Sequence, residues 1–239
     1  MLLEINRIYN MDCMEGMKLI PDNSIDLVVT DPPYKITSRG SSGGTGGILK
    51  DKLNMKGMVF EHNSIKFSEW LPEVYRVLKE RGHAYIMTNN KNLKDMLIEI
   101  ENANFKIFKT LIWAKNSPIT NMYYMDSHEY IIFCRKGKAK RINNCGTKSV
   151  LNIDNVKNKQ HPTEKPIDLM KIFIENSSQE NEIVLDPFMG VGSTAIACIN
   201  TNRNYLGFEL DKKYYEIAKN RINKHIIDNN LQDRYSLIV

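Results

Sequence analysis

Four consecutive residues, Asp31-Pro32-Pro33-Tyr34, combine an acid, two prolines and an aromatic ring directly after an apolar run. That run, Ile25 to Thr30, is rich in β-branched residues and too short for a helix, which predicts a buried strand. Proline has no N–H to give to a β-ladder, so the strand must end at Pro32, and both prolines fix their φ angles. The sequence therefore predicts a stiff corner at the carboxyl end of a strand, where open α/β sheets bind their ligands.

This corner suits chemistry on an aromatic amine, such as the exocyclic nitrogen of adenine or cytosine. The lone pair of such an amine is delocalised into the ring, so the nitrogen is a poor nucleophile. Asp31 and the carbonyl of Pro32 could accept hydrogen bonds from its two N–H groups and draw electron density to the nitrogen, while Tyr34 stacks on the ring. A positively charged methyl donor could then be attacked in line, through positioning and preorganised electrostatics. The alternative is that Asp-Pro-Pro forms a common turn and Tyr34 packs in the core.

A second group of residues has the pattern of a nucleotide-binding turn. Asp186 ends an apolar run, Gly190 and Gly192 follow it, and a helix is predicted from about residue 195. Glycines let the backbone approach a ligand, and the free N–H groups at a helix start face that ligand. Glu209 ends the next predicted strand and could accept both hydroxyls of a ribose. The pattern lacks the third glycine of a dinucleotide fingerprint, which favours a single nucleoside over NAD.

Alternating strands and helices are predicted to position these two groups. Strands are predicted at 4–10, 25–31, 83–88, 105–113, 130–134, 182–186 and 205–209, with a turn at 114–118. Helices are predicted at about 14–19, 67–79, 93–100, after 166, from 195 and at 213–229. This alternation is typical of an α/β domain with a mostly parallel sheet, here ending in an antiparallel strand pair.

Residues 35–63 have no clear periodicity and contain a glycine-rich run at 40–47. A loop of this length inside a compact domain is usually functional or disordered. Because it directly follows the Asp31 corner, it is predicted to be a mobile element over the target base. A plain flexible insertion is the alternative.

The composition is that of a soluble globular protein, with 239 residues of which 42% are hydrophobic and 26% are charged. No apolar stretch is long enough to span a membrane, and the first residues do not resemble a signal peptide. The four cysteines lack the spacing of a zinc site or a disulfide framework, so a reducing, cytoplasmic setting is expected.

Positive charge is concentrated between residues 135 and 160. This stretch has eight lysines and arginines against one aspartate, and its excess is larger than the net +5 of the whole chain. A phosphate-binding surface is predicted here, with a solvated basic loop as the alternative.

Three motifs, taken together and in order, resemble the β class of DNA amino-methyltransferases. They are Asp-Pro-Pro-Tyr at 31–34, His-Pro-Thr-Glu-Lys-Pro at 161–166 and Asp-Pro-Phe-Met-Gly-Val-Gly-Ser-Thr at 186–194. In that class the catalytic motif precedes the cofactor loop, which is a circular permutation of the usual order. The resemblance implies one Rossmann-like α/β domain over 1–239, a mostly parallel seven-stranded sheet with helices on both faces, and S-adenosylmethionine as cofactor.

The resemblance also implies roles for the matching residues. Those implied to hold the target base are Asp31, Pro32, Pro33 and Tyr34. Those implied to bind the cofactor are Asp12, Cys13, His161, Thr163, Lys165, Asp186, Phe188, Gly190, Gly192, Ser193, Thr194 and Glu209, with Lys165 in the segment over its methionine end. Those implied to bind DNA are His128, beside the target base, and Arg135, Lys136, Lys138, Lys140, Arg141 and Lys148 in the target-recognition segment at about 135–160. No metal ion is implied.

The implied reaction is methyl transfer to the N6 amine of adenine in DNA, with the target base flipped out of the duplex. Adenine is preferred because the motif begins with Asp and ends with Tyr, as in the adenine members; the N4 amine of cytosine is the alternative. Methylation of RNA or protein, and a catalytically silent nucleic-acid-binding module, are the other hypotheses. A homodimer and a cognate restriction endonuclease stay open as partners.

Overall fold

A computed structural model of the chain describes residues 3–33, 65–120, 123–157, 159 and 164–238. The strands are β1 (Arg7–Tyr9), β2 (Ile25–Thr30), β3 (Leu78–Thr88), β4 (Lys106–Ile119), β5 (Asp126–Arg135), β6 (Val150–Asn152), β7 (Ile183–Asp186) and β8 (Asn204–Phe208). The helices are α1 (Cys13–Lys18), α2 (Phe67–Val77), α3 (Leu93–Asn102), α4 (Ile167–Ser177), α5 (Ser193–Asn200) and α6 (Lys212–Asp228).

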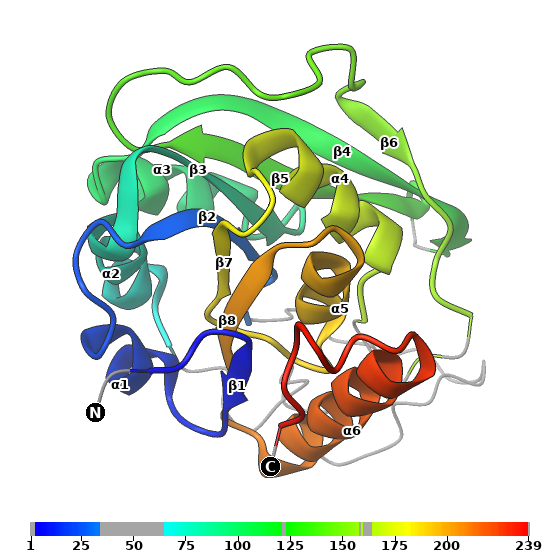
Figure 1. Cartoon of the computed structure of the whole chain (residues 1–239). Coiled ribbons are helices and arrows are strands. Elements are labelled where there is room, and N and C mark those ends of the chain that lie inside the picture. Colours follow the sequence, from blue (N-terminus) through cyan, green and yellow to red (C-terminus); the bar gives the residue numbers. More distant parts are fainter. Residues whose placement is uncertain (1–2, 34–64, 121–122, 158, 160–163, 239) are drawn as a thin grey trace.

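The described strands form one mostly parallel sheet with the order β1-β8-β7-β2-β3-β5-β4-β6. The pairs from β1 through β3 are all parallel, whereas β5 is antiparallel to both β3 and β4. Helices cover both faces: α1, α2 and α3 lie on one side and α4, α5 and α6 on the other (Figure 1). The Rossmann-like α/β architecture predicted from the motifs is therefore confirmed.

The two faces of the sheet supply the two halves of the core, and β2 contributes to both, with an irregular register between Ile25 and Leu27. In β2, Leu27 and Val29 pack toward α4, α5 and α6, while Ile25 and Val28 pack toward α1 and α2. All four side chains are fully or almost fully buried. A strand that is buried on both faces needs a continuous apolar run, and this is why the short apolar segment before Asp31 forms an interior strand.

The sheet differs from the predicted one at one side. It has eight described strands rather than seven, because the short strand β6 adds to β4 in parallel. Only the central residue of β6, Leu151, is buried, so the sequence around it has no apolar pattern to predict from. The turn predicted at 114–118 is also wrong, because β4 continues through it with an irregular register up to Ile119.

The carboxyl ends of three neighbouring parallel strands bring the predicted functional acids together. Asp31 directly follows β2, Asp186 ends β7, and Glu209 directly follows β8. Because these strands are adjacent in the order β8-β7-β2, the three acids lie along one edge of the sheet. Among the described helices, none is long and apolar enough to cross a membrane.

Candidate active site

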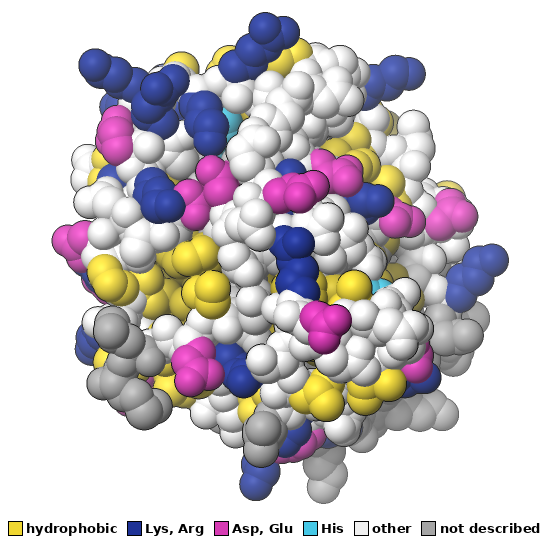
Figure 2. Space-filling model, in the orientation of Figure 1, with side chains coloured by type: hydrophobic (Ala, Val, Ile, Leu, Met, Phe, Trp, Pro, Cys, Tyr) yellow, Lys and Arg dark blue, Asp and Glu magenta, His cyan; other side chains and the backbone are white. Residues whose placement is uncertain are grey.

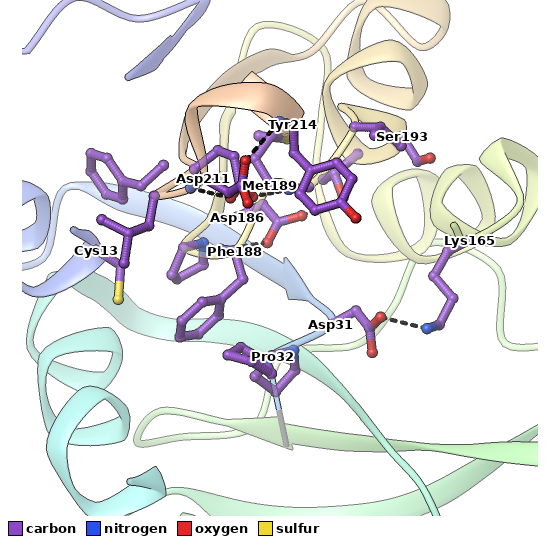
Figure 3. A pocket seen from close by; sticks show the side chains of 18 of the residues that line it. Cys13, Asp31, Pro32, Lys165, Asp186, Phe188, Met189, Ser193, Asp211 and Tyr214 are labelled. Atoms are coloured by element: carbon purple, nitrogen blue, oxygen red, sulfur yellow. Dashed lines mark hydrogen bonds and ion pairs between the residues drawn. The ribbon is translucent and has the colours of Figure 1, made fainter. Parts of the chain in front are cut away.

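A pocket opens at this edge of the sheet, between the ends of the parallel strands and the N-terminus of α5 (Figure 3). It brings together residues that are far apart in the chain. The predicted site residues that line it are Asp12, Cys13, Asp31, Pro32, Pro33, Lys165, Asp186, Phe188, Gly190, Ser193, Thr194 and Glu209. Tyr34, His161, Thr163 and the glycine-rich loop at 35–63 lie outside the described residues.

Asp186 organises the floor of the pocket. One of its carboxylate oxygens accepts hydrogen bonds from the Thr30 hydroxyl at 2.8 Å and from the backbone N–H of Phe188 at 3.1 Å. The other oxygen accepts from the Thr194 hydroxyl at 2.6 Å. Burial raises the pKa of Asp186 to about 6, although these donors oppose the shift. Its carboxylate therefore ties β2, β7 and α5 together and shapes the pocket through the loop that follows β7.

Glu209 holds the opposite wall of the pocket. Its two oxygens accept the backbone N–H of Gly190 at 2.9 Å and that of Asp211 at 2.8 Å. Burial raises the pKa of Glu209 to about 7, and the two backbone donors oppose this shift only in part. A carboxylate has about four lone-pair directions, so Glu209 keeps acceptor capacity for hydroxyl donors of a ligand.

The loop between Asp186 and α5 is shaped to let a ligand approach its backbone. Gly190 and Gly192 have φ angles of 57° and 84°, values that favour glycine. A Cβ at Gly190 would meet no atom within 4 Å, and Ser193 has a buried hydroxyl oxygen with no hydrogen-bond partner among the described residues. Gly192 does not line the pocket but forms the N-cap of α5, whose free N–H groups suit an anionic group.

The wall toward α1 and α2 is mostly apolar. Asp12 caps α1, because its side chain accepts the backbone N–H of Met14 at 2.7 Å. Burial raises the pKa of the Cys13 thiol to about 12, so Cys13 is a neutral, buried pocket residue rather than a nucleophile. The ring of Phe188 packs edge-on against Trp70, with 5.2 Å between the ring centroids. These contacts leave an apolar surface against which a planar ring could lie.

Several lining residues were missed by the sequence analysis. They are Met11, Ile65, Glu164, Met170, Pro187, Met189, Val191, Phe208, Leu210, Asp211 and Tyr214. Asp211 begins α6 as its N-cap, and Tyr214 stands one turn into that helix. The capping signal at Asp211 could have identified the start of α6, but no local signal showed that this helix start faces the Asp186 loop.

The Asp31 corner carries a chain of buried charges. The Lys165 ammonium donates to Oδ2 of Asp31 and lies 3.3 Å from Oε2 of Glu129 on β5. Lys115 on β4 donates to the other oxygen of Glu129. Oδ1 of Asp31 is buried and has no hydrogen-bond partner among the described residues. Beside the pocket, the corner thus holds one acceptor without a partner among the described residues, and Lys165, which the motif had implied at the cofactor, contacts Asp31.

The basic segment does not gather around this corner. Arg135 pairs with His83, and His83 pairs with Leu27, four residues before Asp31, so Arg135 lies roughly 13 Å along the sheet from the level of Asp31. The backbone N–H of Lys138 donates to the carboxylate of Glu80, and the backbone carbonyl of Lys140 contacts the ring of His83. Both contacts lie at the end of the sheet away from Asp31. Figure 2 shows Lys and Arg side chains along the top of this face, where Figure 1 places the loop between β5 and β6.

Arg135, Lys138 and Lys140 therefore lie away from the Asp31 corner. Contact of DNA with Arg135, Lys138, Lys140 and Arg141 stays a prediction, whereas the Lys136 ammonium is committed inside the protein. The chain follows β5 away from the site before it returns through β6. His128 and Lys148 differ from this group. His128 is exposed beside Glu129 at the start of β5, and Lys148 stands two residues before β6, whose Val150 lies level with Tyr130.

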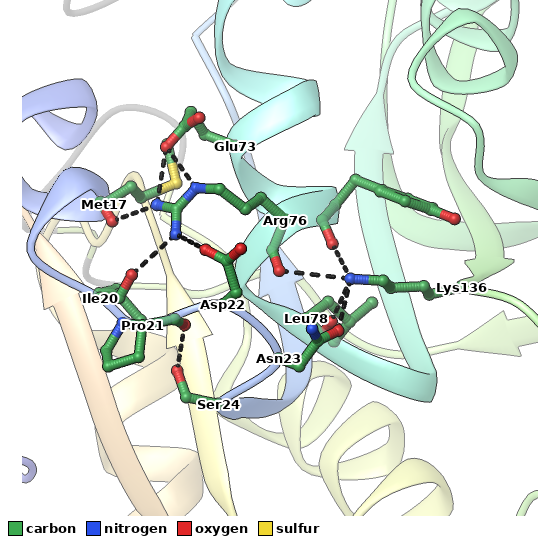
Figure 4. A network of polar contacts seen from close by, with 11 residues as sticks. Met17, Ile20, Pro21, Asp22, Asn23, Ser24, Glu73, Arg76, Leu78 and Lys136 are labelled. Carbon is green, nitrogen blue, oxygen red and sulfur yellow. Dashed lines mark hydrogen bonds and ion pairs between the residues drawn. The ribbon is translucent and has the colours of Figure 1, made fainter.

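Lys136 is a structural residue (Figure 4). Its side chain is only 8% exposed, and its ammonium donates to Oδ1 of Asn23 and to the backbone carbonyls of Tyr75, Arg76 and Leu78. All its donors are committed inside the protein, so it joins the end of α2 to the turn before β2.

We expect Lys136→Met to lower the free energy of unfolding by about 2–3 kcal/mol, because the buried carbonyls would lose a charged donor. DNA affinity should stay within about twofold, since the ammonium does not reach the surface. Urea unfolding and a fluorescence DNA-binding assay check both expectations. Lys138→Met, at an exposed neighbour, is the matched control and should leave stability unchanged. A stable Lys136→Met protein with lost DNA affinity would contradict the structural role.

Comparison with known proteins places this site in a family. A family model described as DNA methylase matches residues 25–220. The type II methyltransferase M.HinfI of Haemophilus influenzae is 31% identical, with 91% of this chain and 68% of that protein covered. The solved M1.HpyAVI–SAM complex is 27% identical with a TM-score of 0.69, and the match covers 90% of this chain and 98% of that chain.

A third match, the cytosine-N4-specific PvuII DNA methyltransferase, has a TM-score of 0.72 over 98% of this chain and 92% of that chain. It is 18% identical, so it shows the fold alone. The family model spans most of the chain, including both the Asp31 corner and the Asp186 loop. The chain belongs to the DNA methylase family of S-adenosylmethionine-dependent methyltransferases.

Proposed function

We propose that this protein transfers the methyl group of S-adenosylmethionine to the N6 amine of adenine in DNA. The observation that carries the proposal is the buried Oδ1 of Asp31, which has no hydrogen-bond partner among the described residues, in a residue that lines the same pocket as Glu209 and the Asp186 loop. An acceptor for an amine and a binding turn for a nucleoside thus share one cavity. This is the arrangement that amine methylation requires.

The residues of the pocket fit S-adenosylmethionine group by group. Glu209 has acceptor capacity for the two ribose hydroxyls, and the apolar wall at Cys13 and Phe188 suits the adenine ring. The open side of Gly190 admits the cofactor close to the backbone, and the orphan hydroxyl of Ser193 offers a hydrogen bond. When bound, the cofactor supplies an electrophilic methyl group next to the Asp31 corner.

The chain's own part in catalysis is to hold and polarise the target amine. Oδ1 of Asp31 and the carbonyl oxygen of Pro32 accept hydrogen bonds from its two N–H groups, which raises the electron density on the nitrogen. When bound, the cofactor would supply its methyl group to this nitrogen and would leave as the neutral thioether. The proton that the amine loses would pass to solvent. Because a base within a duplex cannot reach this pocket, the target base must be flipped out.

Adenine is proposed over cytosine because Asp31 begins the four-residue motif and Tyr34 ends it, as in the adenine members that the sequence resembles. His128 and Lys148 are proposed to face DNA, since both stand toward the Asp31 side of the sheet. The four cysteines are free thiols, which supports a cytoplasmic setting. A homodimer and a partner endonuclease stay predictions.

Labelled methyl transfer to mixed-sequence DNA, followed by nucleoside analysis, tests the proposal. We expect N6-methyladenine as the labelled product. N4-methylcytosine would keep the mechanism and correct the base. No label in DNA, despite measurable binding of S-adenosylmethionine, would contradict the proposed function and favour RNA, a protein substrate or a silent binder.

Cofactor affinity should depend on pH through Glu209. Its pKa of about 7 without cofactor means that a large share of the carboxyl groups is protonated at neutral pH. Hydroxyl donors stabilise the ionised form, so binding releases a proton and affinity rises with pH. We expect the dissociation constant of S-adenosylmethionine to fall about tenfold between pH 6 and pH 8.

Isothermal titration calorimetry in buffers of different ionisation enthalpy checks this proton release directly. Glu209→Gln keeps the shape of the side chain but cannot ionise, so its weaker affinity should be independent of pH. A flat profile for the unaltered protein would rule out a titrating carboxyl at the ribose.

A further inference from the structure

The charged side chains around Asp31 extend well beyond the pocket. Lys165 precedes α4, Glu129 lies on β5 and Lys115 lies on β4, yet their charged ends form one continuous chain that finishes at Asp31. The charges alternate in sign along the chain, and the side chains of Lys165, Glu129 and Lys115 are 5%, 16% and 16% exposed. Such pairs inside a protein are screened far less than surface pairs.

The arrangement is asymmetric at Asp31. The hydrogen bond from Lys165 goes to Oδ2, while Oδ1 has no hydrogen-bond partner among the described residues. Figure 3 shows the two side chains pointing toward each other at the side of the pocket that lies away from Cys13. A carboxylate that is held by one oxygen cannot rotate freely, so its second oxygen keeps one direction.

We propose that Lys165, held by Glu129 and Lys115, is a positioning residue that fixes the Asp31 carboxylate with Oδ1 directed at the target amine. This rests on the proposed function and deepens it. It gives Lys165 a task at the reacting nitrogen, whereas the sequence motif had suggested one at the methionine end of the cofactor. Glu129, in turn, keeps the ammonium from turning away from Asp31.

Electrostatics support this role. Burial raises the pKa of the Asp31 carboxyl, Lys165 pulls that pKa down, and Glu129 pushes it up. Burial also favours the neutral form of Glu129, but Lys165 and Lys115 outweigh it and lower the pKa of Glu129. Lys115 on β4 also lowers the pKa of Asp31, the Asp186 carboxyl on β7 is electrostatically coupled to Asp31, and Lys159 lies near Lys115 and Lys165. The acceptor works only while Asp31 is ionised, so the lysine extends activity to lower pH.

The test is the acidic limb of the pH–rate profile for methyl transfer, measured in single turnovers at saturating S-adenosylmethionine. Lys165→Met keeps the aliphatic stem but removes the charge, and should move this limb up by about 1–3 pH units. Glu129→Gln removes a like charge and should move it in the opposite direction. Lys165→Arg should restore more activity than Lys165→Met, because it keeps the charge.

Two variants keep the test sharp. Lys115 lies farther from Asp31, so Lys115→Met should shift the acidic limb upward by less than Lys165→Met does. This variant still tests the proposal if Lys165→Met does not fold. Lys171→Met removes a charge from an exposed pair with Glu175 on α4, and should not move the limb. The dissociation constant of S-adenosylmethionine for Lys165→Met should stay within about threefold of the original value.

Opposite shifts for Lys165→Met and Glu129→Gln support the positioning role. If both variants lose the same amount of rate and the acidic limb does not move, the positioning role is overturned and the residues serve packing alone. If Lys165→Met loses much cofactor affinity and the acidic limb does not move, Lys165 binds the cofactor instead. If the unaltered protein methylates no DNA, the proposed function fails. Titration of the ¹³C-labelled Asp31 carboxyl by NMR then still tests the same two shifts without turnover.

Discussion

Asp31→Ala is expected to lower the single-turnover rate of methyl transfer by about 10²–10³-fold, while the affinities for S-adenosylmethionine and DNA stay within a few-fold. The variant removes the acceptor that raises electron density on the target nitrogen, and such preorganised contacts are typically worth 10²–10³ in rate. The fold should survive, because Lys165 keeps its ion pair with Glu129 at 3.3 Å.

Asp26→Ala is the matched control for this prediction, because Asp26 is a carboxylate in the same strand, β2. Asp26 pairs with Lys79 at 2.5 Å and accepts the backbone N–H of Ile183 at 3.0 Å, far from the pocket. Its loss should cost stability and leave the transfer rate of the folded protein unchanged. If Asp31→Ala loses DNA affinity and turnover to the same extent, Asp31 acts in DNA binding rather than on the amine.

Glu209→Ala is expected to weaken the binding of S-adenosylmethionine by about 100-fold. Hydrogen bonds to a charged group contribute about 1.5–3 kcal/mol each, and Glu209 is proposed to accept two ribose hydroxyls. The same carboxylate also holds Gly190 and Asp211 through their backbone N–H groups, so its removal loosens both sides of the cofactor site. Calorimetric titration of the cofactor measures the effect.

Glu182→Ala gives a comparable change outside the site. Glu182 accepts the backbone N–H of Gln179 at 2.7 Å before β7, at the opposite edge of the sheet. Its replacement should leave cofactor affinity unchanged. An unchanged affinity in Glu209→Ala itself would refute the assignment of the ribose to this residue.

The pocket was largely predictable because its residues stand at the ends of strands with strong local patterns. Asp31, Asp186 and Glu209 each close a short apolar run, and adjacent parallel strands necessarily bring such ends to one edge. The glycines of the Asp186 loop have positive φ angles, as expected for a turn that approaches a ligand. Local pattern and chain topology together were sufficient for these residues.

The contacts of the lysines were not predictable in the same way. Lys165 reaches Asp31 across 134 positions of sequence, and Lys136 reaches Asn23 across 113. Charge clustering along the chain says nothing about whether an ammonium faces solvent or a ring of carbonyls. The sequence pattern of the basic segment therefore did not show that its charges turn away from the Asp31 corner along β5.

The central claim is tested most directly by a structure of the protein with two ligands. One is a non-transferring amine analogue of S-adenosylmethionine, and the other is unmethylated DNA that contains the sequence the protein methylates. We expect a flipped adenine whose N6 nitrogen lies about 2.7–3.2 Å from both Oδ1 of Asp31 and the Pro32 carbonyl oxygen, with Lys165 still on Oδ2. A flipped base whose amine contacts neither acceptor, or a base that approaches from the far side of the Glu209 wall, would contradict it.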